Sequence, residues 1–365
     1  MRRQVACRTG RVSVDDAGFS LVELLVASVL AMAVMGGVLL FVSTQVPLAR
    51  AQTDAGDLQQ RARAVADILG RAIAEAGAWA DAGGPPGASL ACCVPVVLPR
   101  RLGTTGADAP TVARQDVLTT VAVAPGVVPG RLLSPLPGDL RLAQADGCPP
   151  ARPVCGLREG AHVVIFEWSG RHDFVMVGPP GSDAAPVTAR QAASVSSFAA
   201  GAFAVGVETR TYYFDAARRQ LRVYDGYRSD MPIVDDVEAV AFEYWGAPGA
   251  PATARGDAGA ATCWFDADGV PVLAAEPPPG TANVRMPIET LADGPWCGSG
   301  GNTFDADLLR IRSVRVTVRL AASADDARGR GPAFFRPGRA VDARRLVPDM
   351  EVIIDATPRA LGAAY

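Results

Sequence analysis

The chain begins with a short polar segment followed by a long run of apolar positions. Residues 24–42 carry no charged side chain and consist mainly of Leu, Val, Ala and Met. At about 1.5 Å rise per residue, a helix over this run approaches the roughly 20 residues needed to cross a bilayer. The apolar region of a secretory signal is usually about 7–15 residues long and ends in a small-residue cleavage site, which this run lacks. The pattern therefore favours a membrane-spanning helix over a signal peptide or a buried core helix.

Beyond this run the apolar positions become periodic. Between residues 48 and 79 they recur at spacings of three and four, while charged side chains fill the remaining positions. The apolar set is Leu58, Ala62, Val65, Leu69, Ala72 and Ala76. This period predicts an amphipathic continuation of the helix over residues 47–80 that packs on a globular domain. Pro47 should kink or interrupt the helix, and the Gly/Pro-rich stretch at 83–87 should end it.

Residues 85–365 are rich in short β patterns and are long enough to form one sizeable domain. Several segments alternate apolar and polar residues, as strands with one solvated face do. The predicted strands are 117–124, 161–168, 172–178, 204–214, 219–226, 237–245, 311–321 and 349–356. Hairpin turns are expected at 169–171 and 215–218. The Gly/Pro/Ala-rich residues 246–307 predict an irregular insertion. The predicted class is α+β: a long N-terminal helix packed on an antiparallel β-rich domain with long loops.

Charge sets the expected orientation in the membrane. Residues 1–18 contain four Arg, whereas the whole chain is acidic, with 35 basic and 38 acidic side chains. A basic segment before one apolar helix stays in the cytoplasm, so the domain is expected outside it. All basic residues are Arg, and ten of them gather between 310 and 345. Because the chain is acidic overall and these residues alternate along a strand, we expect a solvated sheet face and no nucleic-acid partner.

One carboxylate, Glu23, lies just inside the apolar run, where a charge is disfavoured and is commonly functional. Together with the basic leader, Gly18 and Phe19, the stretch GFSLVELLVA resembles the processing signal of type IV prepilins and type II pseudopilins. The resemblance implies a leader peptide at residues 1–18 and a transmembrane helix at 19–46. It also implies cleavage between Gly18 and Phe19 and N-methylation of Phe19 by a prepilin peptidase/methyltransferase. Glu23 would then pair with the Phe19 amine of a neighbouring subunit during assembly.

The C-terminal half carries a second resemblance. The segments VDDVEAVAFEYW, LLRIRSVRVTVRLAA and RRLVPDMEVIIDATPRAL resemble the closing region of PilW-type minor pilins. This likeness implies an inner-membrane precursor that enters a type IV pilus. Its partners would be the major pilin, other minor pilins and the inner-membrane assembly platform. Two alternatives remain open: a J-type minor pseudopilin of type II secretion, or a membrane-anchored binding domain.

The seven cysteines include Cys7, which lies in the leader. The other six are an even number in an exported segment, which favours up to three disulfides. These candidates are Cys92, Cys93, Cys148, Cys155, Cys263 and Cys297. A Cys263–Cys297 bridge would hold the insertion in place, and the other four cysteines would pair among themselves. Either Cys148 pairs with Cys155, or both pair crosswise with Cys92 and Cys93; both pairings remain open. Zinc is the rival interpretation, but the spacing lacks the usual close cysteine pairs.

Other chemical signals are weak. His162 and His172 flank a predicted hairpin and are expected to face each other, as a structural pair rather than a metal site. The stretch DADG at 266–269 resembles the start of a calcium loop but lacks its series of oxygen ligands and its closing Glu. There is no G-x-S-x-G motif and no phosphate-binding loop. We therefore expect no enzyme activity, no cofactor and no metal.

Overall fold

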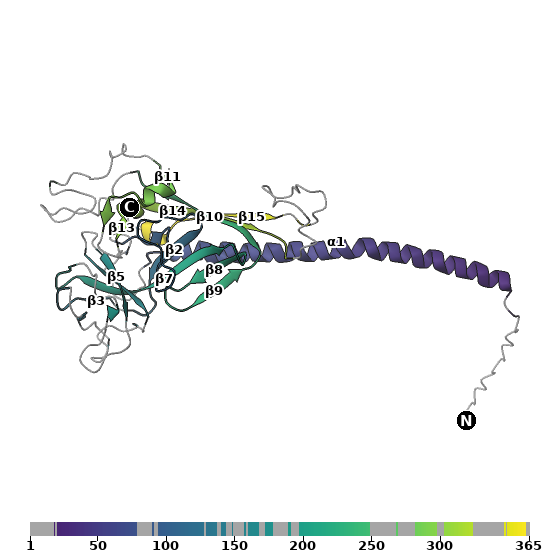
Figure 1. Ribbon diagram of the computed structural model, residues 1–365, viewed down its shortest axis with the longest axis horizontal. Coiled ribbons are helices and arrows are strands. Elements are labelled where there is room, and N and C mark those ends of the chain that lie inside the picture. Colours follow the sequence, from purple (N-terminus) through teal and green to yellow (C-terminus); the bar gives the residue numbers. More distant parts are fainter. Residues whose placement is uncertain are drawn as a thin grey trace, which may run out of the picture. The chain divides into compact units, whose positions relative to one another are not determined.

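The protein is described from a computed structural model (Figure 1). The described residues are 18, 20–78, 90, 94–127, 129–136, 140–143, 148, 157, 160–167, 172–177, 189–190, 197–248, 268, 282–297, 303–323, 347 and 349–362. The chain divides into two compact units, Met1–Thr53 and Asp54–Tyr365. Each unit is described by itself below.

The N-terminal element is the helix α1, Leu21–Glu75, which contributes to both units. Its first part is apolar at nearly every position, and its second part carries an apolar stripe that recurs at helical spacing. The sequence predicted a kink or an interruption at Pro47, but α1 continues through this residue without interruption. Proline has no backbone N–H, so the carbonyl of Ser43 loses its helical donor there while the helix continues.

The larger unit contains a nine-stranded antiparallel sheet in the order β1-β2-β7-β4-β5-β6, with β3 and β8 also on β7 and β9 on β8. The strands are β1 (Val97–Leu98), β2 (Val117–Val123), β3 (Gly130–Arg131), β4 (His162–Phe166), β5 (His172–Val177), β6 (Ala189–Arg190), β7 (Phe203–Asp215), β8 (Gln220–Tyr224) and β9 (Asp230–Val234). The long strand β7 is the centre of the sheet, because β2, β3, β4 and β8 all pair with it.

A second antiparallel sheet has the order β11-β10-β14-β15 (Figure 1). Its strands are β10 (Val237–Gly246), β11 (Val284–Met286), β14 (Ile311–Leu320) and β15 (Met350–Ala356). Around it lie the two-stranded pair β12 (Trp296–Cys297) and β13 (Phe304–Asp305), the 3-10 helices η4 (Ile288–Leu291) and η6 (Ala306–Arg310), and the short helix α3 (Arg359–Gly362).

The core of the larger unit is built by one stripe of α1 and by the inner faces of the sheets. Leu58, Val65, Leu69 and Ile73 of α1 are buried. In β14 the buried residues Val314, Val316, Val318 and Leu320 alternate with half-buried polar ones, because successive side chains of a strand point to opposite faces. This alternation places the apolar side of the second sheet in the core and its arginines outside.

Two sets of hydrogen bonds tie these layers together. The Tyr244 hydroxyl of β10 donates to the carbonyl of Val117 in β2 at 3.3 Å, and burial raises the pKa of Tyr244. The Arg61 guanidinium on α1 donates to the carbonyl of Asp235 at 3.1 Å and to that of Ala321 at 3.2 Å. Arg61 therefore joins the helix to the turns before β10 and after β14.

The predicted α+β class is confirmed, and the eight predicted strands correspond to β2, β4, β5, β7, β8, β10, β14 and β15. The predicted hairpin turn at 215–218 joins β7 to β8, and Asp215 accepts a hydrogen bond there from the Arg218 backbone N–H at 3.0 Å. Within the predicted irregular insertion 246–307, the structure describes residues 246–248, 268, 282–297 and 303–307. Its described part holds β11, η4, β12 and β13, whose short lengths left no alternating pattern to detect.

Candidate functional site

The described N-terminal segment, residues 18 and 20–43, begins with a hydrogen-bonded helix cap. The Ser20 carbonyl accepts from Leu24 N–H at 3.1 Å, which starts α1, and the Ser20 hydroxyl accepts from Val22 N–H at 3.3 Å. In return, the Glu23 carboxylate accepts from Ser20 N–H at 3.1 Å. A Ser and a Glu three residues apart thus satisfy backbone donors that the first helical turn leaves free.

This cap gives Glu23 a local role that the sequence interpretation missed. The S-x-x-E spacing of Ser20 and Glu23 was a readable signal for it. A carboxylate in the first turn also interacts favourably with the positive end of the helix dipole. Both effects offset part of the cost of placing an acid beside an apolar run.

The apolar run forms a single candidate membrane span, Leu21–Ser43. None of its residues is buried, and large apolar side chains are exposed around its whole circumference. The Ser28 hydroxyl donates to the Leu25 carbonyl at 2.9 Å, and the Ser43 hydroxyl to the Leu40 carbonyl at 2.8 Å, so both polar groups are satisfied within the helix. Such a surface requires lipid or other apolar helices around it.

The predicted processing site is described in part. Gly18 is exposed, and a Cβ added to it would meet nothing within 4 Å beyond its chain neighbours, whereas Phe19 lies outside the described residues. Gly36 and Gly37, within the span, also have nothing within 4 Å of an added Cβ. Cleavage between Gly18 and Phe19 and methylation of Phe19 therefore stay predictions.

The comparisons with known proteins bear on this same segment. Residues 15–39 match the family model of the prokaryotic N-terminal methylation motif. No match was found among curated proteins or among solved structures. The matched range contains Gly18, Phe19 and Glu23, so the finding supports a type IV prepilin-like protein, and the candidate membrane span Leu21–Ser43 is consistent with it. It does not extend to the β-rich unit.

The two histidines do not face each other as the sequence predicted. The antiparallel register of β4 and β5 sets His162 opposite Met176 and His172 opposite Phe166, at the two ends of the hairpin. His162 Nδ1 lies 3.2 Å from the Thr209 hydroxyl, and burial lowers the pKa of this imidazole. The buried His172 ring packs against Phe304, with ring centroids 4.2 Å apart. Both rings are part of the core.

Two candidate cysteines lie in the described part of the chain. Cys148 and Cys297 are both buried and disulfide-bonded. The other four candidates, Cys92, Cys93, Cys155 and Cys263, lie outside the described residues. The pairing stays a prediction.

Three carboxylates that the sequence interpretation did not single out lie together at the start of η6. The side-chain oxygens of Asp293, Asp305 and Asp307 lie within 4.8 Å of one another. Asp305 accepts from Gly294 N–H at 2.6 Å and from Asp307 N–H at 2.8 Å, and Asp307 pairs with Arg310 at 2.8 Å. Burial raises the pKa of both Asp305 and Asp307. Asp305 therefore caps the N-terminus of η6, and Asp307 forms an ion pair within it. The calcium-like stretch 266–269 is described only at Asp268, and the expectation of no metal stays a prediction.

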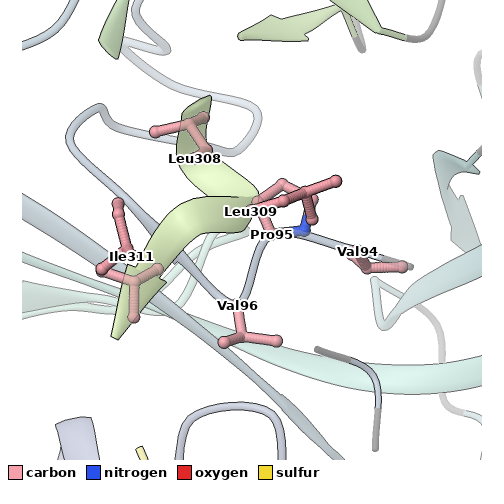
Figure 2. A pocket seen from close by; sticks show the side chains of 7 residues that line it. Val94, Pro95, Val96, Leu308, Leu309 and Ile311 are labelled. Carbon is pink, nitrogen blue, oxygen red and sulfur yellow. The ribbon is translucent and has the colours of Figure 1, made fainter. Parts of the chain in front are cut away.

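Two pockets in the described part of the chain are candidate places for a small ligand. The first, of about 10 Å³, is lined by Val94, Pro95, Val96, Val97, Leu308, Leu309 and Ile311 (Figure 2). It has room for about one water molecule and offers no polar side chain to orient a substrate. The second, of about 210 Å³, lies between the end of α1, β2 and β7 and carries Glu75, Glu208 and Arg210. Both are smaller than the roughly 300–1,000 Å³ of typical ligand sites.

Two arginines of β14, Arg312 and Arg315, have acceptors within the chain. Arg315 Nε donates to Asp355 at 2.7 Å, and Arg312 donates to the Leu309 carbonyl at 2.8 Å. A phosphate backbone would have to compete with these contacts. Residues 328–345 lie outside the described part, so the expectation of no nucleic-acid partner stays a prediction, as does the expectation of no enzyme activity.

Proposed function

We propose that this chain is a minor pilin of a type IV pilus system, of the PilW type, which takes part in pilus assembly through its N-terminal helix. The observation that carries the proposal is the segment Leu21–Ser43. Apart from Glu23 it presents apolar side chains on all sides, it has no buried residue, and it overlaps residues 15–39, the matched motif that contains Gly18 and Glu23. A helix that the protein itself does not cover is suited to a membrane first and to a bundle of similar helices afterwards.

In this proposal the precursor lies in the bacterial inner membrane, with residues 1–18 in the cytoplasm and the β-rich unit outside. The prepilin peptidase/methyltransferase removes the leader and methylates Phe19. The helix then enters the pilus, where its partners are the major pilin, other minor pilins and the assembly platform. The basic leader and the acidic remainder of the chain support this orientation.

Glu23 changes its partner in the proposed assembly step. In the isolated chain its carboxylate accepts from Ser20 N–H at 3.1 Å. Cleavage after Gly18 creates a cationic amine on Phe19 of each subunit. A carboxylate and an amine attract far more strongly in a helix bundle of low dielectric constant than in water, so this contact would set the axial register between subunits.

The proposal is tested by Glu23→Gln, which keeps the size of the side chain and its capping oxygen but removes the charge. Processing and membrane insertion should be unchanged, whereas the amount of the chain in sheared pili should fall about tenfold or more. Asp67→Asn is the matched control, because Asp67 lies on the exposed side of the same helix and pairs with Arg71 in solvent.

Glu23→Gln at the normal level in pili would contradict the assembly role. Deletion of the gene distinguishes a type IV pilus system from a type II secretion system. Loss of pili supports the minor pilin, and loss of protein secretion with intact pili supports the J-type pseudopilin. A chain that needs neither machine would support the anchored binding domain.

A further inference from the structure

The outer strands of the described sheets differ in how their edges are protected. The strands β1, β3 and β6 have two residues each, and β11 has three. The five-residue strand β9 contains Pro232, which lacks a backbone N–H. The strand β15 has seven residues and no proline, and it forms one end of the four-stranded sheet. Short strands and proline are common protections against pairing with another chain, and β15 has neither.

The backbone of β15 is paired on one side only. Its register with β14 runs from Met350 opposite Leu320 to Ala356 opposite Val314. No backbone hydrogen bond from another described residue reaches its second edge. In a paired edge strand, about half of the N–H and C=O groups point outward and offer a template for a further strand.

The side chains of β15 also favour a partner. No residue of the strand is buried, although it contains consecutive Val352, Ile353 and Ile354. Ile354 faces α1 near Gly70, and Ile353 on the opposite face is 58% exposed. Glu351 and Asp355 flank Ile353 on that face and are exposed as well. The open edge therefore presents an acid, an apolar side chain and an acid at alternate positions.

We propose that the free edge of β15 binds an extended segment of a partner protein whose residues alternate as basic–x–apolar–x–basic. The strand already pairs with a basic pattern on its other side. There Arg315, Thr317 and Arg319 of β14 lie opposite Asp355, Ile353 and Glu351. The Asp355 side chain stays 60% exposed despite its contact with Arg315, so it can accept a second cation. Backbone pairing supplies affinity, and these alternate side chains supply selectivity.

The same charges disfavour a second copy of this chain as the occupant. Antiparallel pairing of two β15 strands about Ile353 would set Glu351 of one copy opposite Asp355 of the other. Like charges directly opposite each other destabilise a strand pair. This inference does not depend on the proposed function, because it concerns the β-rich unit alone and not the processing or packing of the N-terminal helix.

The test uses the full chain in detergent and a fluorescein-labelled, end-blocked peptide, TRTVTRT, with fluorescence polarisation as the readout. Binding should saturate, and the acidic peptide TETVTET should bind about tenfold more weakly or worse. A TRTVTRT peptide N-methylated at alternate residues should lose binding, because one edge of its backbone can no longer donate. This comparison of peptides uses the unaltered protein.

Protein variants locate the site. Ile353→Lys should weaken binding of TRTVTRT about tenfold or more, because it places a third cation against the basic peptide and removes the apolar contact. Met231→Lys is the matched control, since Met231 is 56% exposed on the edge strand β9 and should leave binding unchanged. Unaltered circular dichroism and thermal unfolding establish that both variants fold.

Several results would overturn the inference. They are absence of saturable binding at millimolar peptide, equal binding of the acidic and basic peptides, and equal loss in Ile353→Lys and Met231→Lys. Self-association of the chain in analytical ultracentrifugation, abolished by Ile353→Lys, would instead assign the edge to a second copy.

Discussion

Both parts of α1 contain many apolar residues, but the surroundings of these residues are opposite. Across Leu21–Ser43 no residue is buried, and Leu, Val, Met and Phe are exposed on all sides. In Asp54–Glu75 the apolar residues form a stripe, and Leu58, Val65 and Leu69 are buried. The charged residues Arg63, Asp67 and Arg71 occupy the exposed face of the second part.

This difference shows that an apolar side chain indicates burial but not what buries it. The second part of α1 is covered by the sheets of its own unit, and it stabilises that unit by removing apolar surface from water. The first part has no such cover within the described chain. Its apolar residues are therefore available to a membrane and do not contribute to the stability of the β-rich unit.

The largest expected difference between the two parts of α1 comes from truncating one leucine in each. Leu69→Ala removes a fully buried side chain and should lower the free energy of unfolding of the β-rich unit by about 2–5 kcal/mol. Leu30→Ala removes a side chain that is 60% exposed and should leave that free energy unchanged. Denaturant titration in detergent, followed by tryptophan fluorescence, measures both. A similar loss of unfolding free energy in the two variants would show that both parts of α1 stabilise the β-rich unit, which contradicts the comparison.

A second comparison introduces a charge in each part. Met32→Arg places a cation near the middle of the membrane span, where insertion should become less favourable by about 2.5–3.5 kcal/mol. Ile68→Arg adds the same charge to the exposed face of the second part and should leave insertion unchanged. Alkaline extraction of membranes reports the inserted fraction. Normal insertion of the Met32→Arg chain would argue against a membrane span.

A smaller effect is expected in the pH dependence of the stability of the β-rich unit. Burial lowers the pKa of His162 from its ordinary value of 6.5, so the unfolded chain binds this proton more readily than the folded one. Stability from His162 is therefore present above about pH 6.5 and is lost as the pH falls through the lower folded-state value. His162→Gln should flatten the pH dependence of unfolding in that range. An unaltered pH profile in this variant would show that His162 is not the group responsible.

The extent to which the sequence predicted this molecule depends on the length of each pattern. The long strands β7, β10 and β14 were recognisable because a two-residue alternation repeats several times in each. The strand β9 was missed because Pro232 and a polar start break that pattern. The three-residue β11 is too short for any period to appear and is formed through its pairing with β10.

The candidate site was predicted by its motif, but its contacts were not. Gly18, Phe19 and Glu23 were singled out because their stretch resembles the prepilin processing signal, whereas the hydrogen bond between Glu23 and Ser20 required the first turn of α1 to be in place. The arrangement of His162 and His172 was predicted wrongly, because strand register decides which residues lie opposite each other. Register is a tertiary property that two predicted strands do not define by themselves.

The central claim is that Leu21–Ser43 belongs to a processed, prepilin-type N-terminus. The most direct test is the N-terminal residue and the intact mass of the mature chain, purified from membranes of cells with and without prepilin peptidase. The account predicts a chain that begins at N-methylated Phe19 in the first case and keeps residues 1–18 in the second. A mature chain that still begins at Met1, or that has lost the whole apolar segment, would contradict it.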